Sequence, residues 1–428
     1  MNSRQLEALF DRLFPINRSI TGNGLRKSLA IIGEYIPLNI IEYKSGTKCF
    51  DWVVPEEWNI SEAYIEDQNG KRIVDFKENN LHVMGYSIPV FGIFTMDDLL
   101  PHLFTIPEKP DAIPFVTSYY KRNWGFCLSH NTLLKMKDSS YRVCIESELS
   151  EGSLTLGELL IKGKSKKEVL LFSHIGHPSM ANDQLSGPLT LVGLASRLLT
   201  KKEMLKYSYR FVLAPETIGS IAYIARNKSR LRKRVMGGMT AACTADHGGF
   251  TYRTPKRGNT PFDTAVETAL KQSGEIFEIH GFSPLGCDER HFNSHGIGIA
   301  IGSLMRTPPG QYPEYHTSLD NKDFISFDKL TASVDLLESA ISNFESDCII
   351  QAIHKNCEPK LDKHGLYPTT SNKNDKNQET GRLVSIWALA DGRLLSEIST
   401  GLGISTVEAR KLADKLAAHK LIRIRETL

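Results

Sequence analysis

The sequence predicts an α/β protein: a mixed sheet with helices on both faces, an inserted β-rich domain and a C-terminal winged helix. Between residues 163 and 350, apolar runs such as "EVLLFSH" and "YSYRFVLAPE" end in polar residues and alternate with helical patterns such as "SGPLTLVGLASRLL". This alternation is typical of a parallel or mixed sheet covered by helices. Residues 51–162 instead hold short strand patterns separated by turn residues, which indicates a β-rich domain.

The length and composition are those of a globular protein with more than one domain. The chain has 428 residues, more than a single core usually holds. It is 41% hydrophobic and its formal net charge is only +3, so no large basic surface is expected. Seven scattered cysteines without a CxxC pair suggest neither a disulfide framework nor a thiolate zinc site. This cysteine usage suits the cytoplasm, and no apolar run is long enough to predict a membrane span.

The N-terminal half predicts one domain inserted into another. Residues 1–50 hold two helical patterns and a strand-like run, and we expect them to join residues 163–368 in a discontinuous α/β domain. Residues 51–162 form the nested domain, with a hairpin whose turn is Asn69-Gly70. Because the chain returns to the same core, the two ends of the insertion should lie close together.

The C-terminal part predicts a linker and a small separate domain. Residues 369–381 are polar and are expected to be the linker, and residues 382–428 read as a winged helix-turn-helix. Ala409, Leu412, Ala413 and Leu416 form the buried stripe of its third helix. Basic residues leave DNA binding open, but the near-neutral chain favours protein docking or oligomerisation.

Ionisable residues gather where the predicted strands end. His174 ends one strand and His177 and Asp183 follow it, while Glu216 and Asp246 end two other apolar runs and His316 lies in a later loop. Ligands bind at the carboxyl ends of such strands. Histidine and carboxylate side chains form the set that catalytic zinc prefers. We therefore expect one or two Zn²⁺ ions, or another divalent metal, although Asp183 alone could be a helix cap.

The order of these motifs resembles that of zinc-dependent aminopeptidases with paired metal ions. The motifs are "SHIGHPSMANDQLSG", "APETIGS", "CTAD", "CDERHF" and "PEYHTSLDN". Together with "FPINRSITGNG", "DWVVPEEW", "TSYYKRNWGFCLSH" and "CEPKLDKHGLYP", they resemble an aminopeptidase-like family with a nested β-rich domain and a C-terminal winged helix. Members of that family are often found among polysaccharide-biosynthesis genes. The resemblance implies a zinc-exopeptidase-like sheet.

The resemblance also implies roles for individual residues. His174, with His177 as its competitor, would be the first metal histidine, Asp183 the carboxylate between two metals, and Asp246 and His316 the remaining ligands. Aminopeptidases place two adjacent glutamates next, a general base and a ligand, but here the pair reads Pro215-Glu216. Glu216 is therefore either the base or a ligand, and Glu289 is a further candidate for the base. Asp288 matches a helix-start motif near the site.

Other residues are candidates for substrate binding. Tyr120, Arg122 and Trp124 lie together in the nested domain and suit a sugar or an anionic group. Arg253, Arg290, Arg306 and Tyr315 lie close in sequence to the metal motifs. We expect a metal-dependent hydrolase that cleaves an amide bond of a small peptide or a sugar-linked acylamino group. The alternative is a winged-helix regulator, bound to DNA or protein, whose peptidase-like domain only binds a ligand.

Overall fold

The central domain is built on a mixed eight-stranded sheet. The computed structural model describes residues 1–367 and 375–427. The four central strands, β12, β11, β13 and β16, run parallel, whereas β1, β10 and β14 are antiparallel to their inner neighbours. In sheet order the strands are β1 (Asn39–Lys44), β10 (Ser153–Ile161), β12 (Ser208–Ala214), β11 (Glu168–His174), β13 (Val235–Ala241), β16 (Ile301–Met305), β14 (Phe250–Arg253) and β15 (Phe277–His280).

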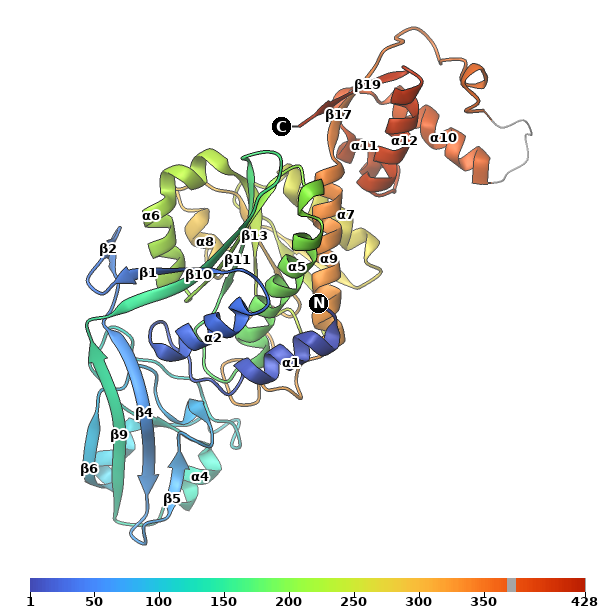
Figure 1. The fold of residues 1–428 in the computed structure, drawn as a ribbon. Helices are drawn as coiled ribbons and strands as arrows, with labels where there is room; N and C mark the ends of the chain where they lie inside the picture. Colours follow the sequence, from blue (N-terminus) through green and yellow to red (C-terminus); the bar gives the residue numbers. More distant parts are fainter. Residues whose placement is uncertain (368–374, 428) are drawn as a thin grey trace.

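Helices cover both faces of this sheet (Figure 1). Every residue of β11 is buried, and its side chains alternate between two cores: Val169 and Leu171 face one, Leu170 and Phe172 the other. The first core is shared with α1 (Ser3–Leu13), α2 (Asn23–Gly33), α5 (Gly187–Thr200), α7 (Pro261–Gln272) and α9 (Phe327–Ser346). The second is shared with α6 (Ile218–Arg234) and α8 (Glu289–Phe292). The predicted fold class is thereby confirmed.

The inserted domain contains a four-stranded antiparallel sheet in the order β5-β4-β9-β6. Its hairpin turns at Asn69-Gly70 as predicted, with Gly70 at a φ of 79°. The larger strands are β4 (Glu57–Glu66), β5 (Arg72–Asp75), β6 (Val90–Thr95) and β9 (Ser140–Ser150). The smaller elements are β2 (Lys48–Cys49), β3 (Trp52–Val53), α3 (Met96–Leu99), β7 (Leu103–Phe104), β8 (Phe126–Cys127) and α4 (His130–Lys135).

The boundaries of the insertion differ from those predicted. Ser45 and Gly152 exchange hydrogen bonds, so the chain leaves and re-enters the central domain at adjacent positions. β10 lies within the predicted range 51–162 but pairs with β1 and β12 of the main sheet. We therefore end the inserted domain near residue 152. The apolar run of β10 looks the same in either sheet, and pairing partners are not visible in a single sequence.

The C-terminal domain begins earlier than predicted, because β17 (Cys348–Ala352) pairs with both of its other strands. The predicted linker is only partly visible: residues 369–374 lie outside the described residues, and 375–381 belong to α10 (Asp375–Ala388). The predicted buried stripe of the third helix is confirmed. The remaining elements are β18 (Asp391–Leu394), α11 (Leu395–Gly401), α12 (Thr406–Ala418) and β19 (Ile422–Glu426).

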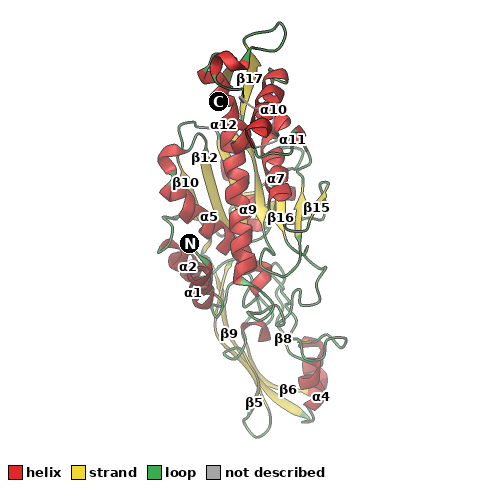
Figure 2. Ribbon diagram, turned by 90° about the vertical axis from the view of Figure 1, so that its right-hand side faces the viewer, coloured by secondary structure: helices red, strands yellow, loops and turns green. Residues whose placement is uncertain are grey.

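The inserted domain and the winged helix lie at opposite ends of the central domain (Figure 2). At the winged-helix end, α12 packs against α9 and α11 against α7. Asp347, just after α9, accepts hydrogen bonds from the backbone and hydroxyl of Ser396 at 2.9 and 2.7 Å. Among the described residues, no helix combines the length and apolarity that crossing a bilayer requires.

Candidate metal centre

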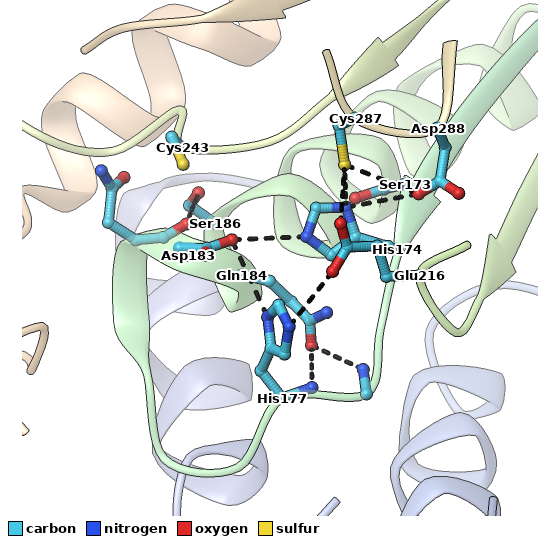
Figure 3. Close-up of polar contacts among 12 residues, drawn as sticks. Ser173, His174, His177, Asp183, Gln184, Ser186, Glu216, Cys243, Cys287 and Asp288 are labelled. Carbon is cyan, nitrogen blue, oxygen red and sulfur yellow. Dashed lines mark hydrogen bonds and ion pairs between the residues drawn. The ribbon is translucent and has the colours of Figure 1, made fainter. Parts of the chain in front are cut away.

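The centre is built at the carboxyl end of β11. His174 is the last residue of this strand, and both His174 and His177 are 4% exposed. The loop that carries His177 is fixed by Gln184, whose side-chain oxygen accepts hydrogen bonds from the backbone N–H groups of Gly176 and His177 at 2.6 and 2.7 Å. Figure 3 shows the two imidazoles facing Asp183.

Asp183 comes from an irregular turn before α5. Residues Ala181–Ser186 form a π-helical segment in which Asp183 itself has non-helical backbone angles. The buried carboxylate of Asp320 holds this turn, because it accepts the N–H groups of residues 181, 182 and 183. The Asp183 carboxylate thereby lies 3.3 Å from His174 Nε2, 3.8 Å from His177 Nδ1 and 3.0 Å from His316 Nε2.

Glu216 follows the end of β12, on the neighbouring strand. Its Oε2 lies 3.4 Å from His177 Nε2, and its side chain is 35% exposed, far more than the histidines beside it. The next residue, Thr217, has a φ of 60°, and its N–H donates to Asp288 Oδ1 at 2.9 Å. This sharp turn directs Glu216 into the centre while α6 starts behind it. Figure 3 shows Glu216 between His177 and the Cys287–Asp288 pair.

The inserted domain contributes the roof of the centre. The ring of Phe115 contacts His177 and His316 edge-on, with ring centroids 4.9 and 5.2 Å apart. The Phe115 N–H donates to the His316 carbonyl at 2.9 Å, and Tyr315 stacks on the His316 ring. His316 has a φ of 54°, an uncommon conformation for a residue other than glycine.

The charges of the centre are strongly coupled. Burial disfavours the imidazolium, but Asp183, Glu216 and Asp288 raise the pKa of His174 to about 9. Burial favours the neutral acid, but the histidines lower the pKa of Asp183 well below its usual range and that of Glu216 to about 2. Burial, together with the charge of Glu216, raises the pKa of Asp288 to about 6. The histidines thus favour the ionised forms of Asp183 and Glu216, whereas burial favours the neutral form of Asp288.

The side chains fit a divalent metal. In the described part of the chain, three sets have ligand atoms within 4.8 Å of one another: His174–His177–Glu216, His174–Cys287–Asp288 and His177–Asp183–His316. Two buried imidazole nitrogens, His177 Nδ1 and His316 Nε2, face the Asp183 carboxylate without a well-aligned hydrogen bond. A metal ion between these groups would bind both nitrogens and the carboxylate. Imidazole and carboxylate groups are the ligands that zinc takes.

The structure does not bring every predicted ligand or base into this centre. Asp246 belongs to none of the three sets, because its two oxygens already accept hydrogen bonds from Asn182, Gly248 and Thr307. Glu289 also belongs to none of the three sets, and its oxygens accept hydrogen bonds from Thr240 and from the Cys287 N–H. Both carboxylates are therefore hydrogen-bond acceptors for residues around the centre rather than members of the ligand sets. From the sequence, a carboxylate at a strand end looks the same in either role.

The predicted arginines also separate. Arg306 is fully buried between Glu275, the Gly248 carbonyl and the Phe250 ring, so it is a structural residue. Arg253 lies on β14, three strands from β11. Arg290, on α8, approaches Thr217 Oγ1, next to Glu216 in the chain, at 3.5 Å.

The predicted aromatic group of the inserted domain faces elsewhere. Trp124 stacks on His102 at 3.7 Å, and Arg122 pairs with Glu56 at the surface. Tyr120 is exposed and contacts Trp52. Tyr119 is the member that approaches the centre: burial raises its pKa, and the charge of Glu216 raises it further. Phe115, Cys287 and Asp320 were not predicted, because their roles depend on contacts between distant segments.

Comparisons with known proteins agree with this architecture. Residues 7–347 match the family described as "Domain of unknown function (DUF4910)", and residues 349–424 match a winged helix-turn-helix family. The chain belongs to the first family. A relative from Clostridium acetobutylicum, provisionally named a polysaccharide biosynthesis protein with an aminopeptidase-like domain, is 43% identical over 417 residues, which cover 97% of this chain and 95% of the relative.

Solved structures of relatives show the same fold. A crystal structure from Clostridium acetobutylicum, provisionally described as a peptidase, has a TM-score of 0.92 at 41% identity and covers 99% of this chain and 96% of its own. A zinc aminopeptidase from Bacillus subtilis has a TM-score of 0.57 at 14% identity, over 79% of this chain and 94% of its own. The protein described here therefore has an aminopeptidase-like fold. Its predicted resemblance to aminopeptidase-like proteins with a C-terminal winged helix is confirmed.

Proposed function

We propose that the protein is a metal-dependent hydrolase that cleaves an amide bond in a small peptide or acylamino substrate. The observation that carries this proposal is the convergence of His174, His177 and His316 on Asp183, with the carboxylate of Glu216 beside them. A divalent metal ion held there would polarise an amide carbonyl and lower the pKa of a water molecule.

Glu216 is our candidate for the general base. It lies on the path of a proton from water to the leaving nitrogen, because its carboxylate is the most exposed in the centre and touches His177. The position before it is Pro215, so a second glutamate is absent from this turn. We propose that Glu216 alone carries the proton, while Asp288 and the N–H of Thr217 hold the turn in place.

The substrate is proposed to be small. The roof formed by Phe115 and Tyr315 lies directly on the histidines, which leaves little room for a folded polypeptide. The name of the Clostridium acetobutylicum relative, which refers to polysaccharide biosynthesis, supports an N-acylated amino sugar as this substrate.

The test is Glu216→Gln with Glu278→Gln as the control. Loss of the base should lower kcat by about 10²- to 10⁴-fold while zinc content and thermal unfolding stay as in the wild type. Glu278 is an exposed carboxylate on β15 that pairs with His280, so Glu278→Gln should retain the turnover. Substrates are aminoacyl reporter amides, N-acylated amino sugars and long peptides. Unchanged hydrolysis by Glu216→Gln, or no bound metal in purified protein, would reject the proposal.

For the winged helix we propose docking rather than DNA recognition. Its third helix, α12, packs against α9, and Arg410 on that helix is paired with Asp414 and Glu426 at 2.9 and 2.7 Å. Lys415 pairs with Glu379, and Arg382 with Glu408. Part of the basic charge is thus neutralised within the domain, including that of Arg410 on α12, which favours a protein partner or a second copy of this chain.

A further inference from the structure

We propose that Cys287 is a thiolate ligand, which makes the centre contain a second metal position formed by Cys287, His174 and Asp288. This inference rests on the metal centre of the proposed function and specifies its ligands. Cys287 precedes α8 and is partly buried. Its sulfur lies 3.3 Å from His174 Nδ1, 3.6 Å from Asp288 Oδ2 and 3.7 Å from Glu216 Oε1.

These distances are close to those of a tetrahedral zinc shell. Zinc bonds of about 2.3 Å to sulfur and about 2.0–2.2 Å to nitrogen or oxygen separate tetrahedral ligand atoms by about 3.4–3.6 Å. The sulfur–oxygen separation of 3.6 Å falls within this range, while the sulfur–nitrogen separation of 3.3 Å and the His174 Nδ1–Asp288 Oδ2 distance of 3.7 Å lie just outside its two limits. Three atoms of the right types therefore surround one point.

His174 faces this point with the correct nitrogen. Its Nε2 lies 3.3 Å from Asp183 on one side, and its Nδ1 faces the thiol on the other. With Asp183 accepting the Nε2 proton, the lone pair of Nδ1 is available to a metal, as in carboxylate–histidine–metal triads. The set His177–Asp183–His316 lies beyond Asp183 and is the other position.

The surrounding groups hold Cys287 and Asp288 in this arrangement. The Cys287 N–H donates to Glu289 Oε1 at 3.1 Å. Asp288 Oδ1 accepts from the Thr217 N–H and the Ser220 hydroxyl at 2.9 and 2.6 Å, which leaves Oδ2 directed at the sulfur and the imidazole. Glu289, the Thr217 N–H and the Ser220 hydroxyl thus act as outer-shell partners that fix the ligand atoms of Cys287 and Asp288.

A thiolate changes which metal the centre selects. Thiolate ligands favour zinc and cobalt over magnesium and manganese, which prefer oxygen. A thiol must lose its proton to bind, so loading this position releases the Cys287 proton to solvent. The centre would then hold one position with nitrogen and oxygen ligands and a neighbouring position with sulfur.

The test is cobalt substitution of the chelated full-length protein, followed by absorption spectroscopy. Wild type should show the near-ultraviolet thiolate-to-cobalt charge-transfer band, and Cys287→Ser should lack it while still binding cobalt at the other position. Zinc affinity at the sulfur position should fall at least tenfold in Cys287→Ser, since even outer-shell changes cost about 10- to 100-fold.

Cys243→Ala is the matched control, because this buried cysteine lies near the centre but outside all three ligand sets. It should keep the band. Cobalt bound to wild type without the band, or a band that survives in Cys287→Ser, would overturn the thiolate ligand and leave the metal centre standing. Failure of wild type to bind cobalt or zinc at all would instead reject the proposed function. Thermal unfolding of each variant checks that the fold is retained.

Discussion

Asp320 determines how Asp183 is presented to the histidines. It is fully buried, and three consecutive backbone N–H groups donate to it at 2.6–3.2 Å. Burial nevertheless raises its pKa to about 7. The turn before α5 therefore depends on one carboxylate supplied from 140 residues further along the chain, and its geometry is not determined by local sequence alone.

We expect Asp320→Ala to destabilise the protein by about 2–4 kcal/mol, because it leaves three buried donors unpaired at about 1–3 kcal/mol each, with partial relaxation. Zinc affinity should fall as well, since Asp183 loses its support. Chemical denaturation and metal titration measure the two effects. Asp320→Asn retains one acceptor oxygen and should lie between wild type and Asp320→Ala; equal stability of all three proteins would contradict this role.

The sequence was sufficient to predict the residues that lie where strands end. His174, His177, Asp183 and Glu216 terminate an apolar run or closely follow one, and they converge with His316, which comes from a later loop. Asp246 meets the same criterion, yet its oxygens are saturated by Asn182 and Thr307. Residues such as Phe115 and Cys287 reach the centre only through the insertion and the loop before α8, so no local pattern identifies them.

At the element scale, the start of α5 is packed too closely for a side chain. A Cβ at Gly187 would meet the Ala241 carbonyl at 2.3 Å and Ser173 Oγ at 2.4 Å. This approach brings α5 against the ends of β11 and β13, next to His174 and Asp183. The glycine is therefore required where the turn that carries Asp183 meets the sheet.

We expect Gly187→Ala to lower the free energy of unfolding by about 1–3 kcal/mol, since the core cannot absorb the added methyl group. Bound zinc should decrease too, because the strand end and the turn must move apart. Gly33→Ala is the control: a Cβ there contacts nothing, so better helix propensity should stabilise α2 by up to about 1 kcal/mol. Unchanged metal content in Gly187→Ala would contradict the coupling.

A second element-scale feature is the junction of the inserted domain. Glu57, at the start of β4, accepts from Arg26 of α2 at 2.6 Å and from the Ser153 N–H at 2.9 Å. It therefore links α2 to the two chain segments that enter and leave the inserted domain. The hydrogen-bonded guanidinium of Arg26 lowers the pKa of Glu57 to about 2.

This lowered pKa gives a pH dependence with a defined sign. The folded-state pKa is below its ordinary value of about 4.5, so the stabilisation is complete above that pH and is lost as the pH falls towards about 2. We expect Glu57→Gln to be less stable than wild type at neutral pH, with a deficit that shrinks between those pH values. Glu34→Gln, which breaks an exposed pair, should show little deficit at any pH.

Strands and helices were predictable from periodicity, but their partners were not. The predicted ranges 51–162 and 163–368 placed β10 in the nested domain and β17 in the α/β domain, yet β10 pairs into the main sheet and β17 into the winged helix. Sequence position suggested the neighbouring domain in each case. The domain boundaries are set by hydrogen bonds between segments that lie about 50 to more than 100 residues apart in the chain. The alternation of apolar and polar residues along one strand does not reveal which distant strand it pairs with.

At the scale of the whole molecule, the central domain carries a different module at each end (Figure 2). The inserted domain reaches the centre through Phe115, so it shapes access to the histidines. The winged helix lies at the far end and is tied to the central domain through Asp347, Ser396 and an ion pair of Lys206 with Glu426. Its position is thus suited to contacts with partners rather than with substrate.

We expect the full-length protein to bind random-sequence double-stranded DNA weakly or not at all. Non-specific DNA binding depends on several free lysine and arginine side chains that release counterions, and here Arg410 is paired while α12 packs on α9. Fluorescence anisotropy at about 50 and about 200 mM salt measures this, with Kd expected above the roughly 10⁻⁴–10⁻⁶ M range of such binders. Lys411 on α12 is exposed and pairs with no carboxylate among the described residues, so Lys411→Ala serves as the check. Tight binding that weakens with salt, and weakens further in Lys411→Ala, would contradict docking and favour a DNA-reading helix.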